Sequence, residues 1–285
     1  MDHIGEFFPN SPIWFRWLGR LAAPLFFYAL AVGFQHTRNR KKYLLRLYLA
    51  NVGMVFFNQI MCMLQRKLDY VAYQPKNHNI FTTLFCAGVL ICIWENRKEK
   101  KKFFTYIGIY IFWQAMVMGL AILAEAFDYV WRGNALLQTV LRTNYIFPLL
   151  GGIWDAEGGV FFIALGIWLY CAVEKKGKLA LHYILFCGAY MFMCQGDILY
   201  RIMSRFSFWG YHKLADVIYF GSSFVGIPLG TSDLSLLTEF YQWMMIGALP
   251  IMLACNGKRG KSFKWLFYAA YPLQFLVLYG ISYYK

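Results

Sequence analysis

The stretch that decides the fold class runs from residue 14 to residue 43 and reads WFRWLGRLAAPLFFYALAVGFQHTRNRKKY. Its first part, residues 14–35, is long enough to cross a bilayer, because a spanning helix needs about 20 mostly apolar residues. This apolar run contains Arg16 and Arg20 and ends in a dense basic cluster. Charged side chains are costly inside a bilayer, so those that occur there commonly take part in function. The stretch therefore predicts a transmembrane helix that carries functional charge.

Composition and further apolar runs extend this prediction to the whole chain. The 285 residues are 60% hydrophobic and only 15% charged, whereas a soluble domain carries about 25% charged residues. We therefore predict an all-α polytopic integral membrane protein with about 8–10 transmembrane helices in a single domain over residues 1–285. After the first run, the expected spans are residues 44–64, 79–95, 103–124, 159–173, 180–198, 237–255 and 265–284.

Two apolar stretches, residues 135–154 and 214–230, are interrupted by polar residues, glycine or proline. Each is interpreted as a broken or re-entrant helix that lines a cavity. A bilayer tolerates such a segment only where protein or water satisfies its backbone.

Four short loops carry most of the basic residues, at 36–43, 96–102, 174–178 and 256–264. The positive-inside rule places them in the cytoplasm of a multi-pass cytoplasmic (inner) membrane protein, with the C-terminus outside. This distribution also accounts for the net charge of +14 and argues against nucleic-acid binding. It places Asp2 and His3 outside, so we expect a translocated N-terminus or a further helix upstream of Met1.

The candidate catalytic residues are Asp2, His3 and Arg20. A carboxylate beside an imidazole orients it and raises its basicity, which suits a general base; the alternative is a surface dipeptide. Arg20 lies four residues before Pro24, which has no N–H to donate to the Arg20 carbonyl. We expect a kink there that opens space beside the guanidinium.

The candidate binding residues for phosphate lie in two basic clusters, and nothing in the histidine or cysteine spacing predicts a metal site. Arginine binds phosphate through paired hydrogen bonds, but such clusters also serve as topogenic charge or as contacts for anionic lipid. The sequence leaves these alternatives open. The residues are His36, Arg38, Arg40, Lys42, Arg46, Lys258 and Arg259.

Three blocks of sequence together resemble the TraX family, known for N-terminal acetylation of conjugative pilin. The first is Asp-His-Ile-Gly at 2–5 with the Arg20 to Pro24 segment and the basic cluster; the second opens a helix at Asn79-Ile-Phe-Thr-Thr. The third is Asn-Gly-Lys-Arg-Gly at 256–260 with Tyr271-Pro272-Leu273. Two features differ from the family pattern: no apolar helix precedes Asp2, and Gln274 stands where the family commonly has histidine.

The resemblance implies an acetyltransferase that takes its acetyl group from acetyl-CoA in the cytoplasm. The acceptor would be a protein N-terminus or a surface glycan outside. In this interpretation His3, oriented by Asp2, acts as base or acetyl carrier. Arg20 stabilises the oxyanion or positions the thioester, and the basic clusters bind the cofactor phosphates. A small-molecule transporter or flippase is the alternative, and a structural membrane protein is a third.

Overall fold

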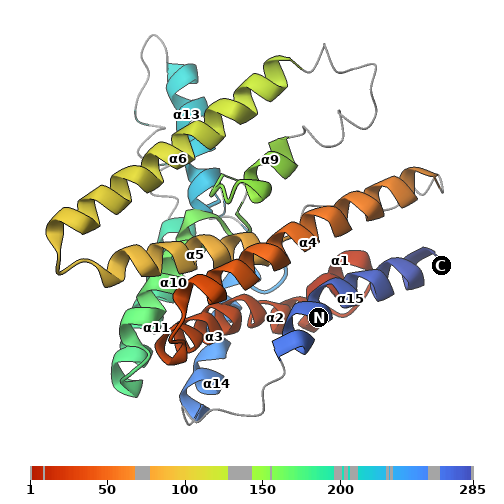
Figure 1. Ribbon diagram of the computed structural model, residues 1–285. Helices are drawn as coiled ribbons and strands as arrows, with labels where there is room; N and C mark the ends of the chain where they lie inside the picture. The colour runs from red at the N-terminus through yellow and green to blue at the C-terminus, as the bar shows by residue number, and fades with distance from the viewer. Residues whose placement is uncertain are drawn as a thin grey trace. The chain divides into compact units, whose positions relative to one another are not determined.

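The computed structural model describes the chain except for residues 1, 9, 68–77, 128–142, 155, 196–200, 202–204, 206–210, 229–230, 232–233, 256–263 and 284–285. The described residues form helices and no strand (Figure 1). Four helical segments are long and apolar enough to cross a membrane: Trp14–His36, Arg40–Leu64, Lys100–Ala126 and Lys176–Gln195. Shorter apolar helices occur at Ile80–Glu95, Gly159–Ala172, Tyr241–Ala254 and Leu266–Ser282. The prediction of an all-α polytopic membrane protein is confirmed.

The chain divides into two compact units, which are described separately. Unit 1 combines residues 1–35 with residues 168–285, and unit 2 comprises residues 36–167. The division falls inside helix α10 (Gly159–Ala172). The sequence predicted a single domain, and this stays a prediction.

Unit 1 begins with two short helices, α1 (Asp2–Phe7) and α2 (Trp14–Gly19). Its other elements are α3 (Ala22–His36, to Gln35), α11 (Lys176–Gln195), α13 (Tyr211–Val225), the 3-10 helix η1 (Tyr241–Gly247), α14 (Ala248–Ala254) and α15 (Lys264–Tyr283). The apolar face of α3 buries Phe27, Leu30 and Phe34, and Phe26 packs edge-on against Phe267 of α15 with 5.3 Å between ring centroids.

The first predicted span, residues 14–35, is interrupted at Arg20, four residues before Pro24. Helix α2 ends at Gly19 and α3 begins at Ala22, so Arg20 and Leu21 form the junction. Pro24 lies in the first turn of α3, where no backbone donor is required. At the position of the expected kink, Arg20 and Leu21 therefore form a two-residue turn within the span Trp14–His36.

The helix predicted over residues 237–255 begins later in the structure than the sequence indicates. A 3-10 helix begins only at Tyr241, and residues 236–239 form a turn instead. Two indole groups hold this turn: Trp17 donates to the Leu237 carbonyl at 2.8 Å, and Trp243 donates to the Leu236 carbonyl at 2.9 Å. Because Trp17 lies more than 200 residues away, local sequence does not reveal this end.

Unit 2 contains α4 (Arg40–Lys67), α5 (Ile80–Glu95), α6 (Lys100–Ala126) and α9 (Thr143–Leu149). A loop follows α9 and leads to α10. Side chains of α4, α5 and α6 hold the last turn of α9 and the backbone of this loop. Asn51 donates to the Pro148 carbonyl at 2.6 Å, and Tyr48 donates to the Leu149 carbonyl at 2.8 Å. This agrees with the prediction of a broken or re-entrant segment in the described part of residues 135–154.

Further side chains complete the support of this loop. The Gln114 amide donates to the Gly151 carbonyl at 3.1 Å and accepts from the Ile153 N–H at 3.0 Å. Gly151 has φ +65°, a left-handed conformation that glycine adopts without strain. In hydrocarbon each unsatisfied backbone group is costly, so these bonds are what permit the loop to lie among the helices.

In the described part of the second interrupted stretch, residues 214–228, a helix ends at a glycine. Helix α13 stops at Val225, and Gly226 follows with φ +88°. The Ile227 N–H bonds back to the Ser222 carbonyl at 2.9 Å, as in a glycine C-cap. The Tyr190 hydroxyl of α11 donates to the Gly226 carbonyl at 3.3 Å.

Candidate active site

His3 lies on α1 against the last helix of unit 1. Its ring centroid is 4.4 Å from that of Phe275 and 6.3 Å from that of Tyr271. One turn later Phe7 packs edge-on against Tyr279 at 4.9 Å. Tyr271, Phe275 and Tyr279 follow one another at intervals of four residues and share one face of α15; we call them the aromatic stripe. The stripe holds His3 half-buried rather than free in a frayed terminus.

Gly5 of the Asp-His-Ile-Gly motif stands where there is no room for a larger side chain. A Cβ atom at Gly5 would lie 2.8 Å from both Cδ and Nε of Arg16. The Arg16 side chain therefore lies directly on the α1 backbone at Gly5, two residues after the imidazole. This close approach brings a guanidinium of α2 to the helix that carries His3.

Arg20 occupies the junction between α2 and α3. Its guanidinium carbon lies 5.0 Å from the centroid of the Tyr241 ring, the first residue of η1, which is the geometry of a cation–π contact. The Tyr241 ring therefore helps to orient the Arg20 guanidinium.

The predicted catalytic residues thus fall in one compact unit. Asp2 is the first residue of α1, while its side chain lies outside the described part. Helix α1 packs on both α2 and α15, and α2 packs on η1. Gln274 lies in α15 between Tyr271 and Phe275 and is half-buried. The position at which the family commonly has histidine therefore adjoins the two rings that contact His3.

The predicted phosphate-binding residues have different surroundings. His36, Arg38 and Lys42 are exposed. Arg40 instead forms an ion pair with Glu95 of α5 at 2.9 Å and also donates to the Thr37 carbonyl. The Arg46 guanidinium lies 5.6 Å from the centroid of the Tyr43 ring. Lys258 and Arg259 lie outside the described residues.

Sequence reasoning missed three features of these sites. The aromatic stripe is visible in the sequence as a four-residue spacing, but in an apolar helix that spacing is indistinguishable from ordinary core packing. Tyr241 carries no local signal, because only the fold brings it to Arg20. The Arg40–Glu95 pair joins the basic segment 38–46 to the basic loop 96–102, and charge counts along the chain do not show such a pairing.

The family model described as TraX protein matches residues 1–147, just over half of the chain. The match includes His3, Arg20 and the basic segment 38–46. No curated protein and no solved structure matches the chain.

Proposed function

The chain belongs to the TraX family, and from this premise we propose that it is an integral membrane acetyltransferase. In the proposal an acetyl group passes from cytoplasmic acetyl-CoA to an acceptor outside, a protein N-terminus or a cell-surface glycan. The observation that carries the proposal is that His3 packs against Phe275 while the Arg16 side chain lies on the backbone of the same helix at Gly5. Arg20 follows Arg16 by four residues, and all three residues lie within the family match.

His3 acts as the general base in this reaction. Imidazole gains and loses a proton near neutral pH, which suits transfer from an acceptor amine or hydroxyl. As the acceptor nitrogen or oxygen forms its bond to the acetyl carbon, the bond from that carbon to the CoA sulfur breaks. The proton passes to His3 and then to the departing thiolate. The contacts with Phe275 and Tyr271 restrict the imidazole, so that it is oriented before the acceptor arrives.

Arg20 stabilises the oxyanion that forms as the thioester carbonyl is attacked. A fixed cation does this best where water is scarce, because electrostatic interactions are then weakly screened. Its position over the Tyr241 ring supports this role, since the contact fixes the guanidinium without neutralising it. The donor phosphates are assigned to the exposed His36, Arg38 and Lys42, with Lys258 and Arg259 as further candidates.

The test measures acetyl transfer in membranes that contain the full chain. Membranes are incubated with acetyl-CoA labelled in its acetyl group, and label in the macromolecular fraction is counted. We expect the His3→Ala variant to lose about 100-fold or more of the rate and Arg20→Ala about 100- to 1,000-fold. Arg20→Lys keeps the charge but not the planar guanidinium, so we expect an intermediate rate.

His182→Gln is the matched control for the histidine variants. His182 lies in α11, with its ring centroid 5.6 Å from that of Trp168, and takes no part in the proposed chemistry. Its variant should transfer acetyl at the wild-type rate. Wild-type transfer in both His3→Ala and Arg20→Ala would overturn the site assignment. A purified protein that does not bind acetyl-CoA would instead favour the small-molecule transporter.

A further inference from the structure

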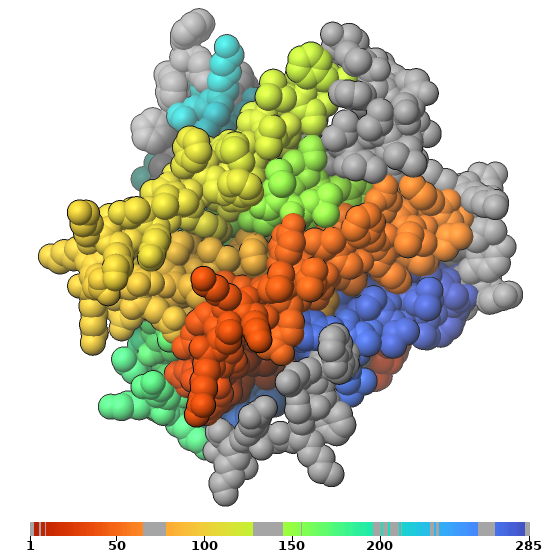
Figure 2. All heavy atoms as spheres, in the orientation of Figure 1, coloured from red at the N-terminus to blue at the C-terminus, as the bar shows by residue number. Residues whose placement is uncertain are grey.

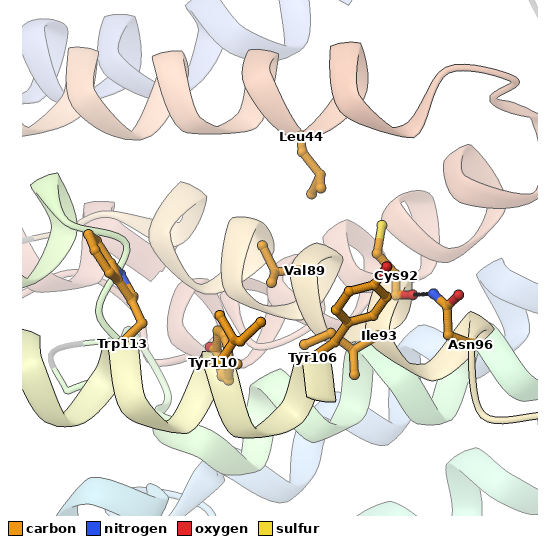
Figure 3. Close-up of a pocket in the computed structure, with 9 residues that line it drawn as sticks. Leu44, Val89, Cys92, Ile93, Asn96, Tyr106, Tyr110 and Trp113 are labelled. Carbon is orange, nitrogen blue, oxygen red and sulfur yellow. Dashed lines mark hydrogen bonds between the residues drawn. The ribbon is translucent and has the colours of Figure 1, made fainter. Parts of the chain in front are cut away.

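A groove of about 400 Å³ lies among three helices of unit 2 (Figure 3). Its volume is within the range of ligand pockets, about 300–1,000 Å³. Leu44 of α4 points toward Val89 and Cys92 of α5 across the groove, and α6 supplies its other side (Figure 3). The lining residues are Leu44, Val89, Cys92, Ile93, Asn96, Tyr106, Ile109, Tyr110 and Trp113.

The groove is apolar and lies open at the surface of unit 2. Ile109 is 61% exposed and Tyr106 42% exposed, although both belong to the spanning helix α6. Figure 2 shows side chains of α4 in orange and α6 in yellow at the surface. The Asn96 amide already donates to the Cys92 carbonyl at 2.8 Å. The lining therefore suits a hydrocarbon chain better than a ligand rich in amides or hydroxyls.

One end of the groove adjoins a cluster of lysines. Asn96 of the lining directly precedes the loop to α6, and Lys98, Lys100 and Lys101 of this segment are exposed. We call these three lysines the basic rim. Its neighbour Lys102 is paired with Glu99 at 2.6 Å, and Tyr106 of the groove lies one turn after Lys102 on the same face. The Arg40–Glu95 pair joins the basic segment of α4 to this end.

We propose that the groove binds one acyl chain of an anionic phospholipid whose phosphate lies on the basic rim. A lipid chain gains little from the hydrophobic effect on entering the groove, because the bilayer it leaves is equally apolar. The headgroup must therefore decide which lipid is retained. Lysines near the membrane surface attract anionic headgroups. This lipid site is additional to the acetyl transfer proposed above and needs none of its residues.

The first experiment measures headgroup selectivity. The full chain is released from nanodiscs made of equal parts phosphatidylglycerol and phosphatidylcholine. Native mass spectrometry then identifies, by mass, the lipids that stay bound to the protein. We expect phosphatidylglycerol to be retained preferentially. The Lys98→Gln/Lys100→Gln/Lys101→Gln variant should lower that preference by roughly five-fold or more. The control variant Lys175→Gln/Lys176→Gln/Lys178→Gln makes the same charge change in exposed lysines just before and within the first turn of α11 and should keep the preference.

The second experiment locates the chain. Phosphatidylglycerol with a photoreactive diazirine in its acyl chain should cross-link to α4, α5 and α6 at the groove. Val89→Phe fills the groove and should remove these cross-links, whereas Leu181→Phe, at a 57% exposed position of α11, should not. Equal retention of the two lipids, cross-links outside the groove, or loss of the bound lipid to excess acetyl-CoA would each overturn the proposal. If Val89→Phe does not fold, the surface lysine variant still decides the headgroup claim.

Discussion

Asn51 is the residue whose replacement tests the architecture of unit 2 most directly. Its side chain is fully buried and makes three hydrogen bonds. It donates to the Pro148 carbonyl at 2.6 Å and accepts from Asn79 and from the Thr82 hydroxyl, each at 2.7 Å. Leucine has the same branching pattern as asparagine and is larger, so the Asn51→Leu variant removes the polar contacts and leaves no cavity.

The expected loss of stability follows from these contacts. Hydrogen bonds between membrane helices contribute about 0.6 kcal/mol each on average, so three amount to roughly 2 kcal/mol. The Pro148 carbonyl is then left buried without its donor, which costs about 1–3 kcal/mol more. We therefore expect Asn51→Leu to lower the free energy of unfolding by about 3–5 kcal/mol.

The assay is reversible unfolding in mixed micelles, with increasing denaturing detergent and helicity as the signal. Asn58→Leu is the control, because Asn58 is also buried and donates a longer hydrogen bond, of 3.2 Å, to the His78 carbonyl. The Asn58→Leu substitution should lower the free energy of unfolding by about 1 kcal/mol. If the free energy of unfolding of Asn51→Leu lies within about 0.5 kcal/mol of the wild-type value, the loop does not depend on this network and the reasoning is refuted.

Three further predictions follow from other parts of the structure. Gly5→Val should abolish most acetyl transfer while the protein still inserts, because the added side chain displaces Arg16; equal rates in labelled acetyl-CoA assays would contradict this. Tyr241→Leu should lower acetyl transfer and Tyr241→Phe should retain it, since only phenylalanine keeps a ring beneath Arg20; equal loss in both would assign the effect to the hydroxyl. In mild detergent, maleimide should label the exposed Cys171 and Cys255 and leave Cys86, Cys187 and Cys194 unlabelled, as mass spectrometry of peptides would show.

Helices and their approximate ends were predictable because apolar runs and charged loops are local properties. The span expected at 79–95 is observed as α5, Ile80–Glu95, and the interruption near Arg20 follows from Pro24. Contacts between distant residues were not predictable in this way. The delayed start of η1 depends on Trp17, and the tie between the two basic segments depends on Arg40 and Glu95. These contacts join residues far apart in sequence, and a single sequence carries no record of such pairings.

The candidate site was predictable in its chemistry but not in its surroundings. His3 and Arg20 were chosen because imidazole and guanidinium groups are unusual beside an apolar run. What orients them is aromatic: Phe275 and Tyr271 for the histidine, Tyr241 for the arginine. With 20% aromatic residues in the chain, no single ring stands out in the sequence as a partner.

The loop between α9 and α10 has a consequence for biosynthesis. The loop and the last turn of α9 are held by side chains that all precede them in the chain: Tyr48, Asn51, Thr83 and Gln114. During synthesis the helices that carry these side chains leave the ribosome first. The loop then enters the bilayer when its partners are already present. Its polar backbone groups can therefore form these hydrogen bonds without first being exposed to lipid. Reversing this order, by a circular permutation that makes α9 and its loop before α4, would expose the same backbone to hydrocarbon and should favour degradation over insertion.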